Sequence, residues 1–165
     1  MKKLIIAALL LAPVALFAQK FGHFNSVDII QALPEFTTAQ NELKTLGDQY
    51  QKELQAMQDE YKRKIDNYTA QRDSLPPVVL ERRQQEIQEL GQRYQQTAEG
   101  YQQELSKMEE DKMTAIRQKV LGAVKQIGDA GGYVYIMDTS MGIPYISATL
   151  STDVTAEIKS KLGIK

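Results

Sequence analysis

The sequence predicts an α+β protein: a long antiparallel helical hairpin, or coiled-coil arm, on a small β-containing oligomerisation body. A helical pattern runs from Pro34 to about Gly131, the motif Ser74-Leu75-Pro76-Pro77 interrupts it once, and short strand-like segments flank it. Because a helix cannot continue through Pro-Pro, the chain must turn there and return. At ~1.5 Å per residue, the two arms would be roughly 60 and 80 Å long.

The first 18 residues have the composition of an export signal. Two lysines follow Met1, an apolar run extends from Leu4 to Phe17, and Ala18 is a small residue at which cleavage can occur. The alternative is a retained membrane anchor, but the apolar run is short for a spanning helix. Cleavage would leave 18 basic and 21 acidic residues, a net charge of about −3. This balance does not suggest a nucleic-acid partner.

The residues that follow predict a short strand and a short helix. Phe21–Asn25 has strand character, and Asn25 or Ser26 can cap a helix that extends to Leu33. Pro34 suits the first position of the next helix, where the missing N–H costs nothing. The first arm therefore begins at Pro34.

Apolar side chains recur at helical spacing along both arms and form a narrow stripe rich in Tyr and Met. Such a stripe ordinarily holds the two helices together. Tyr and Met are also adaptable contact residues, so part of the stripe near the turn is a candidate surface for a client protein. The candidate client-binding residues are Met57, Tyr61, Ile65, Tyr68, Leu75, Leu80, Ile87 and Tyr94.

Two further features lie near the turn. If the arms pair about Pro76, Gly91 falls opposite Tyr61, where a small residue accommodates the ring. The segment from Tyr61 to Arg83 carries an excess of about three positive charges, which is either a solvated face or a surface that attracts anionic groups. The basic residues of this tip are Lys62, Arg63, Lys64, Arg72, Arg82 and Arg83.

The C-terminal segment predicts the rest of the body. Gly131-Gly132 ends the second arm, and the strands Tyr133–Asp138 and Pro144–Thr149 are expected to form a hairpin. Asp153 is expected to cap a last helix. The body would thus comprise residues 19–33 and 131–165, and the arm residues 34–130. So small a body favours self-association. The candidate interface and core residues are Phe24, Val134, Ile136 and Ile146.

No pattern in the chain predicts catalysis. There is no Cys, and His23 is the only His, so neither a zinc site nor a thiol or Ser-His centre is indicated. No glycine motif of the phosphate-binding kind follows a strand. We therefore expect a protein that is not an enzyme, with no catalytic residue, no metal and no cofactor.

Several motifs, taken in order, resemble the Skp/OmpH family of periplasmic chaperones. They are Phe24-Asn-Ser-Val-Asp-Ile-Ile, Leu33-Pro-Glu-Phe36, the interrupted charged hairpin, Val120-Leu-Gly-Ala-Val-Lys-Gln-Ile127, Tyr133-Val-Tyr-Ile-Met-Asp138 and Asp153-Val-Thr-Ala-Glu-Ile158. The resemblance implies a periplasmic homotrimer. Its three arms would surround a cavity that holds unfolded outer-membrane proteins without using nucleotide.

One departure from the family concerns charge. The best-known members are strongly basic, whereas this chain has a pI near 5.9. Contact with lipopolysaccharide or an anionic membrane surface is therefore expected to be weak and confined to the tip. Two alternatives stay open: a coiled-coil adaptor or spacer in the cell envelope that binds a folded partner, and a membrane-associated protein that keeps its N-terminal segment.

Overall fold

The computed structural model describes residues 19–164, so the predicted signal peptide lies outside the described residues. The described chain divides into two compact units. The arm comprises Pro34–Ile116, and the body comprises the described residues up to Leu33 together with those from Arg117 onward. The sequence placed the second boundary at the end of the helix, near residue 130. The body instead includes the last four turns of that helix, because they form its core.

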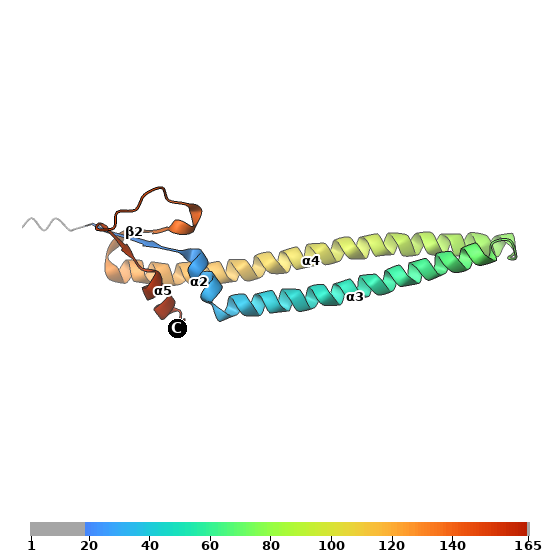
Figure 1. The fold of residues 1–165 in the computed structure, drawn as a ribbon, viewed down its shortest axis with the longest axis horizontal. Helices are drawn as coiled ribbons and strands as arrows, with labels where there is room; N and C mark the ends of the chain where they lie inside the picture. Colours follow the sequence, from blue (N-terminus) through green and yellow to red (C-terminus); the bar gives the residue numbers. More distant parts are fainter. Residues whose placement is uncertain (1–18, 165) are drawn as a thin grey trace, which may run out of the picture. The chain divides into compact units, whose positions relative to one another are not determined.

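The arm is a hairpin of two long helices that lie side by side (Figure 1). Helix α3 spans Pro34–Gln71 and helix α4 spans Pro77–Gly131, of which the part up to Ile116 belongs to the arm. The predicted break is confirmed: residues 72–76 form the turn, and Pro77 is the first residue of α4. Pro34 likewise begins α3, as expected.

The body contains a three-stranded sheet in which β1 is the central strand (Figure 1). Strand β1 spans Lys20–Phe24, β2 spans Tyr133–Asp138 and β3 spans Ser151–Asp153. Both outer strands run parallel to β1, with Phe21 opposite Tyr135 of β2 and Ser151 of β3. Parallel neighbours need a long crossover, and the helical hairpin supplies the one between β1 and β2.

The predicted hairpin of strands is wrong. Residues 144–149 form no strand, and β2 is followed by the 3₁₀ helix η1, Thr139–Met141, and then by an irregular segment. Both outer strands take β1 as their partner instead of each other. The sequence signals used for the prediction were local, whereas this pairing joins residues more than a hundred positions apart. The prediction of a strand at Tyr133–Asp138 is confirmed.

Two short helices complete the body: α2, Ser26–Ala32, and α5, Thr155–Lys161. Asn25 caps α2 as predicted, since its side-chain oxygen accepts hydrogen bonds from the N–H groups of Val27 and Asp28. The expected cap of α5 is displaced by one residue: Val154 occupies the cap position, and Asp153 accepts a hydrogen bond from the N–H of Thr155.

The core of the body brings together α2, α5, β1 and the end of α4. The side chains of Ile29 and Ile158 are completely buried, and Leu33 and Val154 are 1% exposed. Gly132 ends α4 with a φ of 66°, a backbone conformation that favours glycine. The other buried side chains of the body are Phe24, Val120, Ala123 and Ile127.

Candidate functional site

The seam between α3 and α4 buries four side chains of the arm: Ala39, Tyr50, Leu90 and Ile116. Of the eight candidate client-binding residues, Leu75 lies in the turn and the other seven lie along the same seam, and each of the eight is half-buried. The stripe is therefore used mainly for helix packing, and only part of each side chain remains accessible. Among the described residues of the arm, Val78 beside the turn is the large apolar side chain that is most exposed.

Two residues that contact each other across the hairpin are separated from the turn by about the same number of residues. Gly91 lies opposite Tyr61 as predicted, and a Cβ placed on Gly91 would be 3.4 Å from the Tyr61 ring. Farther from the turn, the rings of Tyr50 and Tyr101 stack, and Lys112 pairs with Glu42. The antiparallel register inferred from the Pro-Pro turn is therefore confirmed.

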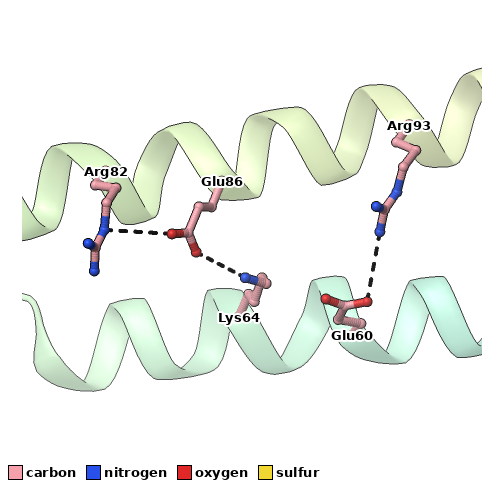
Figure 2. A network of polar contacts seen from close by, with 5 residues as sticks. All are labelled: Glu60, Lys64, Arg82, Glu86 and Arg93. Atoms are coloured by element: carbon pink, nitrogen blue, oxygen red, sulfur yellow. Dashed lines mark hydrogen bonds and ion pairs between the residues drawn. The ribbon is translucent and has the colours of Figure 1, made fainter.

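An ion-pair network crosses the hairpin near the turn (Figure 2). Glu86 of α4 accepts a hydrogen bond from the Lys64 ammonium of α3 at 3.0 Å and lies 3.7 Å from the Arg82 guanidinium. The hydrogen bond and the charge of Lys64 hold the pKa of the Glu86 carboxyl below its usual value. One turn away, Arg93 lies 4.0 Å from Glu60. These contacts tie the two helices together at this level.

Four of the six basic residues of the tip have a side-chain partner. Lys64 and Arg82 share Glu86, Arg72 lies 3.7 Å from Asp73, and the Arg83 guanidinium donates to the Gln71 side-chain oxygen at 2.7 Å. Within residues 19–164, Lys62 and Arg63 are the two tip residues that form no ion pair or side-chain hydrogen bond, and both are exposed. The free positive charge of the tip is thus smaller than its composition suggests.

Two shallow grooves flank the Lys64–Glu86 pair, with volumes of about 380 and 310 Å³. Charged and amide side chains line most of both grooves, and Ile87 or Leu90 adds apolar surface. Such grooves suit a polar or charged chain segment better than an apolar ligand. Within the described residues, no three His, Cys, Asp or Glu side chains are grouped to hold a metal ion.

A second candidate surface is the outer face of the body's sheet, which we define by Phe21, His23, Tyr135, Met137 and Leu150. These residues line a groove of about 300 Å³ together with the segment from Ile143 to Ile146. The Phe21 and Tyr135 rings pack with centroids 4.8 Å apart. Tyr135 and Met137 remain about half exposed, and Leu150 is 72% exposed. An uncovered apolar face of this kind is typical of an interaction surface.

The predicted interface residues are distributed over different parts of the body. Phe24 is buried in the core, Ile136 is half-buried toward α4, Val134 is 59% exposed, and Ile146 lines the outer face. Sequence reasoning missed Tyr135, Met137 and Leu150. The period-two alternation of β2 separates Tyr135 and Met137 from Val134 and Ile136, but it does not say which pair faces the helices.

The model of the OmpH-like outer membrane protein family matches residues 20–162, which is most of the chain. The chain belongs to the Skp/OmpH family. The chaperone protein Skp of Vibrio cholerae serotype O1 is 26% identical over 137 residues, which cover 83% of this chain and 81% of that protein. The resemblance inferred from the motifs is thereby confirmed.

The fold is also that of a solved family member. A Caulobacter crescentus CB15 protein described as OmpH-like superposes with a TM-score of 0.75 over 87% of this chain and 83% of its own, at 16% identity. That likeness confirms the α+β fold with its long helical hairpin. Within residues 19–164, no helix of this Skp/OmpH protein is both long and apolar enough to cross a membrane.

Proposed function

We propose that the protein is an ATP-independent holdase chaperone that binds unfolded outer-membrane proteins and keeps them soluble for membrane insertion. The observation that carries this proposal is a family-type hairpin whose eight apolar stripe residues are each only half-buried. A partly exposed seam offers many weak contacts and no deep pocket. A client held by weak contacts dissociates once it can form stronger contacts elsewhere.

The proposed contacts combine two kinds of surface on the arm. Partly exposed Tyr and Met side chains adapt their shape to different apolar segments. The charged grooves beside Lys64 and Glu86 suit the polar residues that alternate with apolar ones in a membrane β-strand. The outward basic pair, Lys62 and Arg63, supports at most weak contact with lipopolysaccharide or an anionic membrane surface.

We propose further that the protein works as a homotrimer joined through the body. The apolar outer face and the free edges of β2 and β3 support self-association, because exposed edges and apolar faces are ordinarily covered. Three arms on one assembly would raise the local concentration of weak contacts around a single client. We also propose that residues 1–18 direct export and are removed near Ala18, which places the mature chain in the periplasm.

The proposal is tested by light scattering while a urea-unfolded outer-membrane β-barrel protein is diluted into buffer without nucleotide. The chaperone should suppress aggregation and form a soluble complex with the client. Equal aggregation with and without the protein would contradict the proposal. An oligomer that ignores unfolded clients would favour the alternative of an envelope adaptor or spacer.

A matched pair of variants tests the role of the stripe. Met57→Gln combined with Tyr68→Gln removes apolar contact at two half-buried positions, and Gln58→Ala combined with Thr69→Ala changes the exposed residues next to them. The first variant should need more protein for the same suppression of aggregation, whereas the second should behave as the wild type. Circular dichroism of both variants checks that the helices stay folded.

A further inference from the structure

His23, the single histidine of the chain, lies on the central strand of the sheet and faces the apolar groove of the outer face. Its Nδ1 forms a hydrogen bond of 2.8 Å with the Ser151 hydroxyl of β3. Its Nε2 has no hydrogen-bond partner within residues 19–164, and it is not among the buried polar atoms that lack one. Solvent therefore reaches Nε2 in the separate protomer.

The electrostatic surroundings of His23 are simple. Asp153 of β3 is its partner in the strand register. Burial opposes ionisation of Asp153, but hydrogen bonds from Thr155 and the charge of His23 hold the pKa of this carboxyl below its usual value. The other ionisable groups that line the groove are the phenols of Tyr135 and Tyr145.

We propose that His23 makes self-association of the body pH-dependent, so that neutral imidazole permits a second copy to cover the outer face and imidazolium opposes it. This inference rests on the proposed homotrimer. A second copy seated on Phe21, Tyr135 and Met137 would exclude water from the groove and from Nε2. Burial of the neutral imidazole costs the hydrogen bond that water makes to Nε2, whereas burial of the cation without a new partner costs much more.

The carboxylate of Asp153 does not remove this cost. Its attraction to a charged His23 already acts in the separate protomer, so association adds only the part that the exclusion of water strengthens, and burial of the exposed carboxylate has a desolvation cost of its own. The Ser151 hydroxyl is likewise already used by Nδ1. Association therefore favours the neutral ring, and acidification shifts the equilibrium toward separate protomers.

The composition of the chain makes the effect attributable to this residue. Histidine is the side chain whose ordinary charge change falls between pH 5 and pH 8, and the chain has one histidine and no cysteine. A change from pH 7.5 to 5.5 should therefore weaken association, and because a trimer carries three such rings, their effects on the association constant multiply.

Sedimentation velocity of the purified protein over a range of concentrations at pH 7.5 and 5.5 tests the inference. We expect the wild-type oligomer to dissociate at much higher protein concentrations at pH 5.5 than at pH 7.5. The variant His23→Gln keeps a polar group near Ser151 but cannot become charged, so its association should change little with pH. His23→Asn serves as a second uncharged variant, and circular dichroism checks that all samples stay folded.

The outcomes separate the two proposals. A wild-type oligomer that changes less than about tenfold in association constant, or a Gln variant that changes as much as the wild type, overturns the role of His23 and leaves the trimer standing. A protein that is monomeric at pH 7.5 overturns both the trimer and the inference drawn from it.

Discussion

Tyr50 of α3 stacks face to face on Tyr101 of α4, with ring centroids 3.8 Å apart and ring planes 3° apart. Each ring also faces a carboxylate: the Tyr101 hydroxyl donates a hydrogen bond to Glu53 of α3, and the Tyr50 hydroxyl faces Glu104 of α4. The two contacts are reciprocal: each tyrosine hydroxyl engages a glutamate of the opposite helix, and that glutamate lies three residues after the tyrosine on which the ring stacks. This stack joins the helices between the ion-pair network and the far end of the arm.

The stack predicts unusual titration of two tyrosines. Hydrogen bonding to Glu104, aided by burial and by the negative charge, raises the pKa of Tyr50 to about 12, and Glu53 raises the pKa of Tyr101. A raised pKa means that the folded protein favours the protonated phenol. The resulting stability is complete below about pH 10, the unfolded value, and is lost as the pH rises through the folded value.

Ultraviolet absorbance at 295 nm during an alkaline titration measures this effect. Two of the eight tyrosines should ionise above the unfolded value of about pH 10 while the protein stays folded. The variant Tyr50→Phe should lose one late step. Its urea unfolding midpoint should also fall less than that of the wild type between pH 9 and pH 11. Late ionisation that persists unchanged in this variant would contradict the assignment.

Two glycines of α4 predict opposite effects of the same substitution. A Cβ on Gly100 would meet nothing within 4 Å, so Gly100→Ala should stabilise the helix by about 0.5–1 kcal/mol. A Cβ on Gly131 would lie 2.5 Å from the Tyr133 ring, so Gly131→Ala should destabilise the protein by about 1–3 kcal/mol. Urea unfolding of both variants measures the sign of each change in stability. A gain in stability for Gly131→Ala would contradict the close approach of residue 131 to the Tyr133 ring.

The elements that the sequence predicted well are those with local physical signals. Pro34 and Pro77 begin the two long helices because proline suits that position, and the Asn25 side chain caps α2. Gly132 ends α4 because its φ of 66° favours glycine. The contact of Gly91 with Tyr61 followed from the register set by the turn.

The elements that the sequence did not predict depend on contacts between distant residues. The pairing of β3 with β1 joins Ser151 to Phe21, and no turn signal between them reports it. The exposure of Tyr135 and Met137 depends on which face of β2 the helix α4 covers. The candidate stripe was identifiable from its spacing, but the half-burial of Tyr61 and Tyr68 required the packed hairpin.

The core of the body predicts a strong contrast between two apolar residues. Ile158 of α5 is completely buried, so Ile158→Ala should lower the free energy of unfolding by about 2–4 kcal/mol. Leu121 of α4 is 59% exposed, so Leu121→Ala should cost less than about 1 kcal/mol. Urea unfolding measures both. Similar losses for the two variants would mean that Leu121 is covered in solution.

The ion-pair network predicts a stability term that depends on pH and salt. Because the pKa of Glu86 is lowered in the folded state, its contribution is present above the ordinary value of about 4.3 and disappears as the pH falls through the folded value. Glu86→Gln should therefore lower the thermal midpoint at pH 7 by a few degrees, about 1–5 °C. The gap to the wild type should close toward pH 3.

The matched control for Glu86→Gln is Glu99→Gln, an exposed carboxylate on the same helix that forms no ion pair within residues 19–164. Its thermal midpoint should follow that of the wild type at every pH. Because the Lys64–Glu86 pair is about 40% exposed on both sides, 1 M salt should also narrow the gap between Glu86→Gln and the wild type at pH 7. A gap that is equally large at pH 3, or unchanged in 1 M salt, would mean that Glu86 stabilises the hairpin through packing and not through its charge.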